Sequence, residues 1–231
     1  MNKTTLIKEL HIRGIELTDK QVDELFDLMK STLETNEKFN LTAIKDEESF
    51  LEKMVFDSAI ALQGVDLTDK TAIDVGTGAG FPGMVLYILN PQVNLTLLDS
   101  TKKKIDYLRQ YCEAHNYKVN CISARAEEFA MREGFDYAFA RAVAPLNILL
   151  ELIIPMLKVG GTFVALKGQG FEDELVAAEK AMSKLGCHLK EIIEDELPEC
   201  GEKRALIHIV KDKVTNTKYP RQYSEIKKLP L

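Results

Sequence analysis

A dense group of glycines follows an acidic residue in the first half of the chain, at a spacing that suits ligand binding. The residues, in order, are Asp74, Gly76, Gly78, Gly80, Pro82 and Gly83. Glycine adopts positive φ and lets the backbone approach a ligand closely, because it has no Cβ. Pro82 suits the first turn of a helix, whose free N–H groups bind polar or anionic groups. The segment predicts a cradle for a nucleotide-like cofactor.

Two types of cofactor fit this cradle. Gly78 to Gly83 matches the G-x-G-x-x-G pattern of dinucleotide-binding proteins, and Asp99 follows at about the distance of a ribose-binding acid. Asp74, however, places a carboxylate beside the turn, where it disfavours a pyrophosphate and favours a cation. S-adenosylmethionine carries an ammonium and a sulfonium group and no phosphate. The sequence therefore favours S-adenosylmethionine and leaves a nicotinamide dinucleotide as the alternative.

Helices alone are expected before residue 65, and strands alternate with helices after it. The expected helices are 3–13, 18–40 and 46–62, and the expected strands are 71–75, 95–98, 119–122, 137–140, 162–166, 189–194 and 205–210. This order predicts an α/β fold with a doubly wound, mostly parallel seven-stranded sheet and an antiparallel closing pair. The closing pair favours a class I methyltransferase over a dehydrogenase. We expect a helical extension at 1–65, the α/β body at 66–212 and a basic tail at 213–231.

Composition narrows the class of protein. The net charge of −6 is not that of a general nucleic-acid binder, yet residues 211–231 carry six Lys or Arg against two Asp or Glu. Such a tail predicts local contact with a polyanion, or else a solvated segment. There is no apolar run of about 18 residues and no secretory core in residues 1–10, so we expect a cytoplasmic protein. The four cysteines are scattered, which predicts neither a metal site nor a disulfide frame.

Several polar residues follow the expected strands, at the sheet edge where ligands of open α/β sheets bind. The predicted cofactor contacts are Asp74, Gly76, Gly78, Asp99, Ala126 and Glu127. Asp99 is expected to take both ribose hydroxyls, and a backbone N–H of Ala126 or Glu127 to bond the adenine edge. For each residue alone, a charge or turn on a surface loop is the simpler explanation. Their shared position at strand ends favours a common binding site.

The end of the fourth strand suggests what accepts the transferred group. The segment Ala140 to Leu146 contains neither the D-P-P-Y-type turn of amino-methylating enzymes nor a nucleophilic cysteine, and no histidine. An acceptor with its own lone pair needs only alignment, and guanine N7 in an unpaired base is such an atom. For such an acceptor, the Arg141 guanidinium is expected to donate hydrogen bonds to guanine O6 or to a phosphate. The alternative is a salt bridge from Arg141 to a carboxylate such as Glu127.

Seven short motifs occur together in one order along the chain. They are Asn40–Ile44, Asp57-Ser58, Asp74–Gly83, Leu97–Ser100, Arg125–Glu128, Ala140–Ala142 and Leu166–Gly168. With them the chain resembles the bacterial small-subunit ribosomal RNA guanine-N7 methyltransferases, the glucose-inhibited division protein B family. The resemblance implies a class I fold, S-adenosylmethionine as donor, and one guanosine of 16S ribosomal RNA as substrate. It also places cofactor contacts on Gly76, Phe81, Ala126, Glu127 and Arg141.

Two positions depart from the family pattern. Met54 stands where the family usually has the histidine of H-x-x-D-S, so no acid–base role of that histidine is available. The tail keeps Arg221, Lys228 and Pro230 but lacks the usual glycine turn, so RNA docking through the tail is expected to differ.

The leading hypothesis is methyl transfer to guanine N7 by a monomer that binds 16S ribosomal RNA or the small ribosomal subunit. Arg141 and Lys167 are the candidates for holding the guanosine and its phosphates. The alternatives are a nicotinamide-dependent dehydrogenase and an RNA-binding assembly factor with a vestigial cofactor pocket. The latter predicts unchanged function when Gly76 and Gly78 are made bulky.

Overall fold

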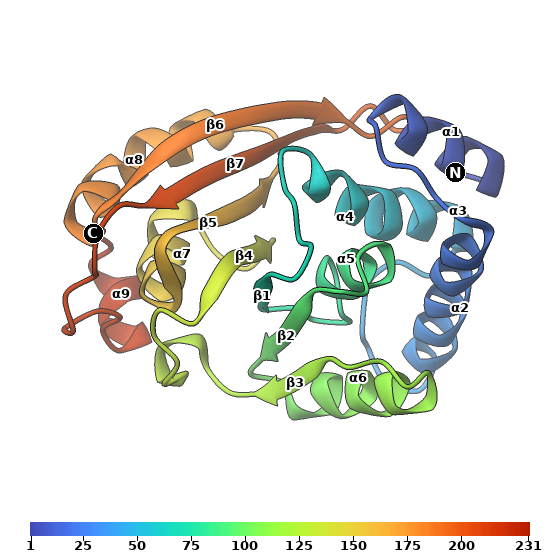
Figure 1. Ribbon diagram of the computed structural model, residues 1–231, viewed down its shortest axis with the longest axis horizontal. Coiled ribbons are helices and arrows are strands. Elements are labelled where there is room, and N and C mark those ends of the chain that lie inside the picture. Colours follow the sequence, from blue (N-terminus) through green and yellow to red (C-terminus); the bar gives the residue numbers. More distant parts are fainter.

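A twisted seven-stranded sheet forms the centre of the fold in the computed structural model, which describes residues 1–231 (Figure 1). The strand order is β3-β2-β1-β4-β5-β7-β6. The first five strands in this order pair in parallel, and β7 is antiparallel to both of its neighbours. The strands are β1 Thr71–Val75, β2 Asn94–Asp99, β3 Asn120–Ser123, β4 Phe135–Arg141, β5 Leu157–Lys167, β6 Cys187–Glu196 and β7 Lys203–Lys211. The expected class I, mostly parallel sheet is confirmed.

The direction in which successive strands are added to the sheet reverses between β1 and β4, which makes this parallel pair the topological switch point. From β1 the chain winds out through β2 to β3, then returns to place β4 on the other side of β1. Ligands of open α/β sheets bind at the carboxyl ends of strands near such a point. Val75 and Arg141 end these two strands, so the candidate residues lie at this edge.

Helices cover both faces of the sheet. α5 (Gly83–Leu89) and α6 (Lys102–Ala114) pack on one face, and α7 (Leu146–Ile153) and α8 (Phe171–Leu185) on the other. Neighbouring residues of one strand point to opposite faces, so Ala72 enters the first core cluster and Ile73 the second. Strands buried on both faces explain the continuous apolar runs of the sequence.

The N-terminal helices share the first core with α5 and α6. They are α1 (Lys3–Ile12), α2 (Asp19–Asn36), α3 (Glu47–Phe50) and α4 (Asp57–Ala59), with a π-helical segment Leu51–Phe56 between the last two and a 3₁₀ turn Ile60–Leu62 after them. A capping box opens α2, because the Thr18 and Gln21 side chains each accept from the other residue's backbone N–H. α2 ends before the expected residue 40, since the Asn36 side chain accepts from Leu41 N and Thr42 N.

The C-terminal residues fold back over α7 (Figure 1). They include a short helix, α9 (Tyr223–Lys228), and Tyr219, Ile226 and Leu231 are buried in the second core cluster. The tail is therefore a packed part of the fold, unlike the solvated segment that composition allowed. None of the helices is both long and apolar enough to cross a membrane.

Candidate functional site

The glycine turn after β1 has a shape that larger residues do not permit. Gly76 has a φ of +74°, and a Cβ on it would lie 2.5 Å from Val143 Cγ2. Gly76 N and Thr77 N both donate to Leu98 O, which joins the turn to the end of β2. Gly78, with a φ of +59°, donates its N–H to Asp99 Oδ2 at 2.9 Å. Hydrogen bonds from the backbone N–H groups hold the turn. Positive φ favours glycine at both positions, and close contact with Val143 excludes a larger residue at position 76.

Asp74 stabilises this turn from its buried side. Its carboxylate is fully buried, and Oδ2 accepts from the Thr77 hydroxyl at 2.6 Å and from Gly83 N at 2.8 Å. The other oxygen, Oδ1, is buried without a hydrogen-bond partner. Burial raises the pKa of Asp74 to about 6, and the bonds from Thr77 and Gly83 limit the rise. The orphaned oxygen makes this turn an unfavourable neighbour for an anion and a favourable one for a cation.

A cavity of about 330 Å³ lies beside the turn. We call it the glycine cavity; it is lined by Val75, Gly76, Leu98, Asp99, Ser100, Thr101, Lys104, Ala124, Arg125, Ala126, Glu127, Ala142, Val143, Leu152 and Tyr223. Asp99 is held at its wall, because Oδ1 accepts from Thr101 N at 2.7 Å while Oδ2 accepts from Gly78 N. Each carboxylate oxygen keeps a second lone pair for a ligand hydroxyl.

A second cavity, of about 620 Å³, lies beyond the end of β4. We call it the arginine cavity; it is lined by Lys53, Met54, Asp57, Arg141, Ala142, Val143, Ala144, Pro145, Leu166, Lys167, Gly168, Glu174 and Arg204. Both volumes fall in the range of small-molecule sites.

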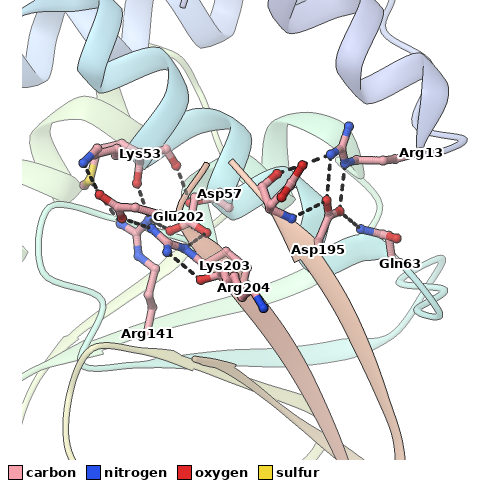
Figure 2. Close-up of polar contacts among 12 residues, drawn as sticks. Arg13, Lys53, Asp57, Gln63, Arg141, Asp195, Glu202, Lys203 and Arg204 are labelled. Carbon is pink, nitrogen blue, oxygen red and sulfur yellow. Dashed lines mark hydrogen bonds and ion pairs between the residues drawn. The ribbon is translucent and has the colours of Figure 1, made fainter. Parts of the chain in front are cut away.

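Asp57 joins two arginines on one wall of the arginine cavity (Figure 2). Asp57 Oδ2 lies 3.3 Å from Arg141 Nη1, and Oδ1 accepts from Arg204 Nε at 2.8 Å. Arg141 Nη1 also donates to Lys53 O at 2.9 Å, and its Nη2 lies 3.2 Å from Met54 Sδ. Arg141 thus forms the salt bridge to a carboxylate that was the expected alternative, but its partner is Asp57 and not Glu127.

Lys167, at the end of β5, is fixed across the same cavity. Its Nζ donates to Ala144 O at 2.8 Å and to Glu174 Oε2 at 2.7 Å. Glu174 Oε2 also accepts from Leu146 N, so one carboxylate holds both the lysine and the start of α7. The lysine side chain is 8% exposed. An ammonium so placed is available to a ligand in the cavity without free rotation.

The two cavities share one wall, the backbone and side chains of Ala142 and Val143. Ala142 has a φ of +53°, a strained conformation for a residue with a Cβ. Such strain concentrates at functional sites. Ligands in the two cavities would meet at this wall, next to Gly76.

The structure divides the predicted site residues into three groups. Gly76, Asp99, Ala126 and Glu127 line the glycine cavity, and Arg141 and Lys167 line the arginine cavity. Asp74, Gly78 and Phe81 line neither. Phe81 is buried, with its ring 5.4 Å from that of Phe50 and the Arg141 guanidinium 6.0 Å above it.

Three lining residues were not predicted from the sequence: Lys53 and Arg204 line the arginine cavity, and Tyr223 lines the glycine cavity. Asp57 was indicated only as part of the Asp57-Ser58 motif. Lys53 and Asp57 lie in the helical segment before β1, Arg204 lies on β7, and Tyr223 begins α9. No local signal brings these positions together, although the family motif at Asp57-Ser58 marks one of them.

Comparisons with known proteins agree on one family. The model of rRNA small subunit methyltransferase G (GidB) matches residues 21–207. Ribosomal RNA small subunit methyltransferase G of Alkaliphilus oremlandii is 42% identical over 224 residues, 94% of each chain. The protein of that name from Halalkalibacterium halodurans is 41% identical over 237 aligned positions, covering all of both chains.

A solved structure shows the same fold at low identity. The 1,6-didemethyltoxoflavin-N1-methyltransferase of Burkholderia thailandensis, with bound S-adenosylhomocysteine, has a TM-score of 0.57 and 15% identity. The similarity covers 85% of this chain and 92% of that one. The sequence matches are far more specific than this shared fold. The chain therefore belongs to the rRNA small subunit methyltransferase G family.

Proposed function

We propose that this protein transfers a methyl group from S-adenosylmethionine to N7 of a guanosine in 16S ribosomal RNA. The observation that supports this most is the pair of cavities with one shared wall at the switch point of the sheet. The glycine cavity takes the donor and the arginine cavity takes the base, so that Ala142 and Val143 flank the path between them. Family membership favours this activity over a dehydrogenase.

The residues of the glycine cavity and its turn fit a cationic donor. Gly76 allows close approach of a ligand, and the buried Asp74 behind the turn disfavours a pyrophosphate. Asp99, Ala126 and Glu127 all line this cavity. We assign the Asp99 carboxylate to the ribose hydroxyls and the backbone N–H of Ala126 or Glu127 to the adenine edge. When bound, S-adenosylmethionine supplies a methyl group on a sulfonium, which a lone pair attacks without loss of a proton.

The arginine cavity fits an acceptor that needs positioning and no base. Its lining has no histidine or cysteine, and its two carboxylates, Asp57 and Glu174, are both held in ion pairs. Guanine N7 carries a lone pair at neutral pH, so alignment suffices. Arg141 and Lys167 donate to guanine O6 or to flanking phosphates, which leaves N7 free to react.

The same proposal extends to the binding partner, the oligomeric state and the cellular location of the enzyme. The enzyme acts as a monomer in the cytoplasm, on 16S ribosomal RNA or on the small ribosomal subunit. The helical extension, residues 1–65, then contributes the Lys53 and Asp57 side of the base-binding cavity to the body at 66–212.

Methyl transfer to unmodified RNA tests the proposal. The protein is incubated with tritiated S-adenosylmethionine and 16S RNA transcribed in vitro, alone and assembled into small subunits. We expect incorporation at one guanosine, located by borohydride–aniline cleavage, and its loss in Arg141→Ala. Incorporation at a base other than guanine, or none in either substrate, would overturn the proposal.

A further inference from the structure

The C-terminal segment Thr215–Leu231 is anchored to the body by buried charge. Glu151, in α7, is completely buried, and both of its carboxylate oxygens bind Arg221. Arg221 Nε donates to Oε1 at 2.7 Å and Nη2 donates to Oε2 at 2.6 Å, while Arg221 N donates to Oε1 at 3.0 Å. A buried bidentate pair of this kind is strongly directional and leaves little freedom to the segment that carries it.

A second arginine fixes the start of the same segment. Arg132 donates to the carbonyl oxygens of Thr215 and Tyr219. Apolar burial completes the attachment, because Tyr219, Ile226 and Leu231 all enter the core cluster around α7 and α8. Arg221 is therefore committed to Glu151 and is not a free cation for a polyanion, although the basic composition of the tail suggested such contact.

This anchoring brings Tyr223 to the glycine cavity. Tyr223 is two residues after Arg221 and is partly buried against the α7 cluster. It is the only aromatic residue among those that line the glycine cavity. Around it lie Ala126 and Glu127, proposed above for the adenine edge, and Leu152 of α7.

A purine in this cavity needs apolar faces as well as edge contacts. The other apolar lining residues are aliphatic, among them Leu98, Ala126 and Leu152. Aromatic rings stack on purines with a gain that aliphatic side chains do not match. Because the ion pair at Glu151 sets where Tyr223 lies, the segment and the cavity form one unit.

We propose that the C-terminal segment is part of the donor site, with the Tyr223 ring as the aromatic surface for the donor's adenine. The proposal rests on the proposed function, because it takes the glycine cavity as the donor site. Tyr223 thus binds the donor and takes no part in the transfer step. Arg221 and Glu151 are positioning residues that act through it.

Donor affinity in three variants of the full chain tests this assignment. Calorimetric titration with S-adenosylmethionine and with S-adenosylhomocysteine is compared for wild type, Tyr223→Ala, Tyr223→Phe and Leu229→Ala. Loss of one aromatic–base contact is expected to weaken both ligands about tenfold in Tyr223→Ala. Tyr223→Phe should bind as wild type does, because the ring is kept. Leu229→Ala, in an exposed side chain of the same segment, should also bind as wild type does.

Kinetics and stability separate this role from general damage. In Tyr223→Ala the KM for the donor should rise about tenfold while kcat stays unchanged, because ground state and transition state lose the same contact. Glu151→Gln should weaken donor binding in the same direction, and thermal melting shows whether each variant is folded. Equal affinity of folded Tyr223→Ala and wild type would overturn the inference. Failure of wild type itself to bind S-adenosylmethionine would instead overturn the proposed function.

Discussion

Replacement of Asp74 by asparagine tests the electrostatics of the glycine turn. The carboxyl group is fully buried and one oxygen lacks a partner, so ionisation is disfavoured in the folded chain. Its pKa rises from 3.8 to about 6 on folding. A shift of about two units corresponds to about 3 kcal/mol of differential stability between the two protonation states.

The direction of the pH effect follows from the sign of this shift. The folded state holds the Asp74 proton more tightly than the unfolded state does. Protonation of Asp74 therefore stabilises the folded state, and this contribution to the free energy of unfolding is fully present below pH 3.8. It is lost as pH rises through about 6. An asparagine does not titrate, so the unfolding free energy of wild type relative to Asp74→Asn should fall with rising pH. Of the full change, about 2 kcal/mol should appear between pH 4.5 and 7.5.

Urea denaturation at several pH values measures this difference. The asparagine oxygen can still accept from Thr77 and Gly83, and its unpaired NH₂ costs the same at every pH, so neither affects the slope. Asp136→Asn is the matched control. Although burial raises the pKa of Asp136, hydrogen bonds from Thr71 and Lys158 lower it to about 2. Its effect is lost only in acid, as pH falls through about 2, so the difference should be flat from pH 4.5 to 7.5.

A flat difference for Asp74→Asn across this range, or one that grows with pH, would refute the reasoning. The donor adds a second measurement. Ionised Asp74 behind the turn favours a cationic ligand, so wild-type affinity for S-adenosylmethionine should rise between pH 5 and 7. The asparagine variant should show a smaller rise.

Four further changes have expected outcomes. Gly76→Ala should abolish measurable donor binding in calorimetry, because the new Cβ meets Val143 at 2.5 Å, whereas Gly78→Ala has no contact closer than 3.9 Å and should bind more weakly but detectably. Asp57→Asn should lower the melting temperature and reduce RNA methylation at least tenfold while donor affinity is kept, since two partly buried arginines lose their shared carboxylate. Lys167→Met should raise the KM for RNA in the methylation assay and leave the KM for the donor unchanged. An equal loss of donor affinity in the last two variants would contradict the division into two cavities.

The sheet and its glycine turn were predictable because their signals are local. Apolar runs between turn residues marked each strand, and the residues from Asp74 to Gly83 carry their own turn chemistry. The mostly parallel, doubly wound sheet followed from the alternation of strands with helices and from the closing pair, whereas the order of the strands came from the structure alone. The expected fold and the family resemblance are both confirmed.

Only some residues of the arginine cavity could be predicted, because its wall is formed by contacts between residues that are distant in sequence. Arg141 and Lys167 were selected as strand-end residues, a rule that holds without knowledge of their partners. Asp57 is 84 residues from Arg141 and 147 from Arg204. It also follows a π-helical segment, which widens the helix by one residue per turn and shifts the residues that face the cavity. Apolar periodicity at 3.6 residues does not reveal such a change.

The expected division at residue 65 marks a change in element type and not a boundary between cores. One apolar cluster runs from Met1 through α2 to Leu206 of β7. Figure 2 shows a further tie, in which Arg13 forms a bidentate pair with Asp195 of β6, and Gln63 donates to the same carboxylate. Loss of packing in the extension should therefore reach the base-binding side first. The glycine turn, which is held by Leu98, Asp99 and Asp74 within the sheet, does not depend on the polar ties of the extension.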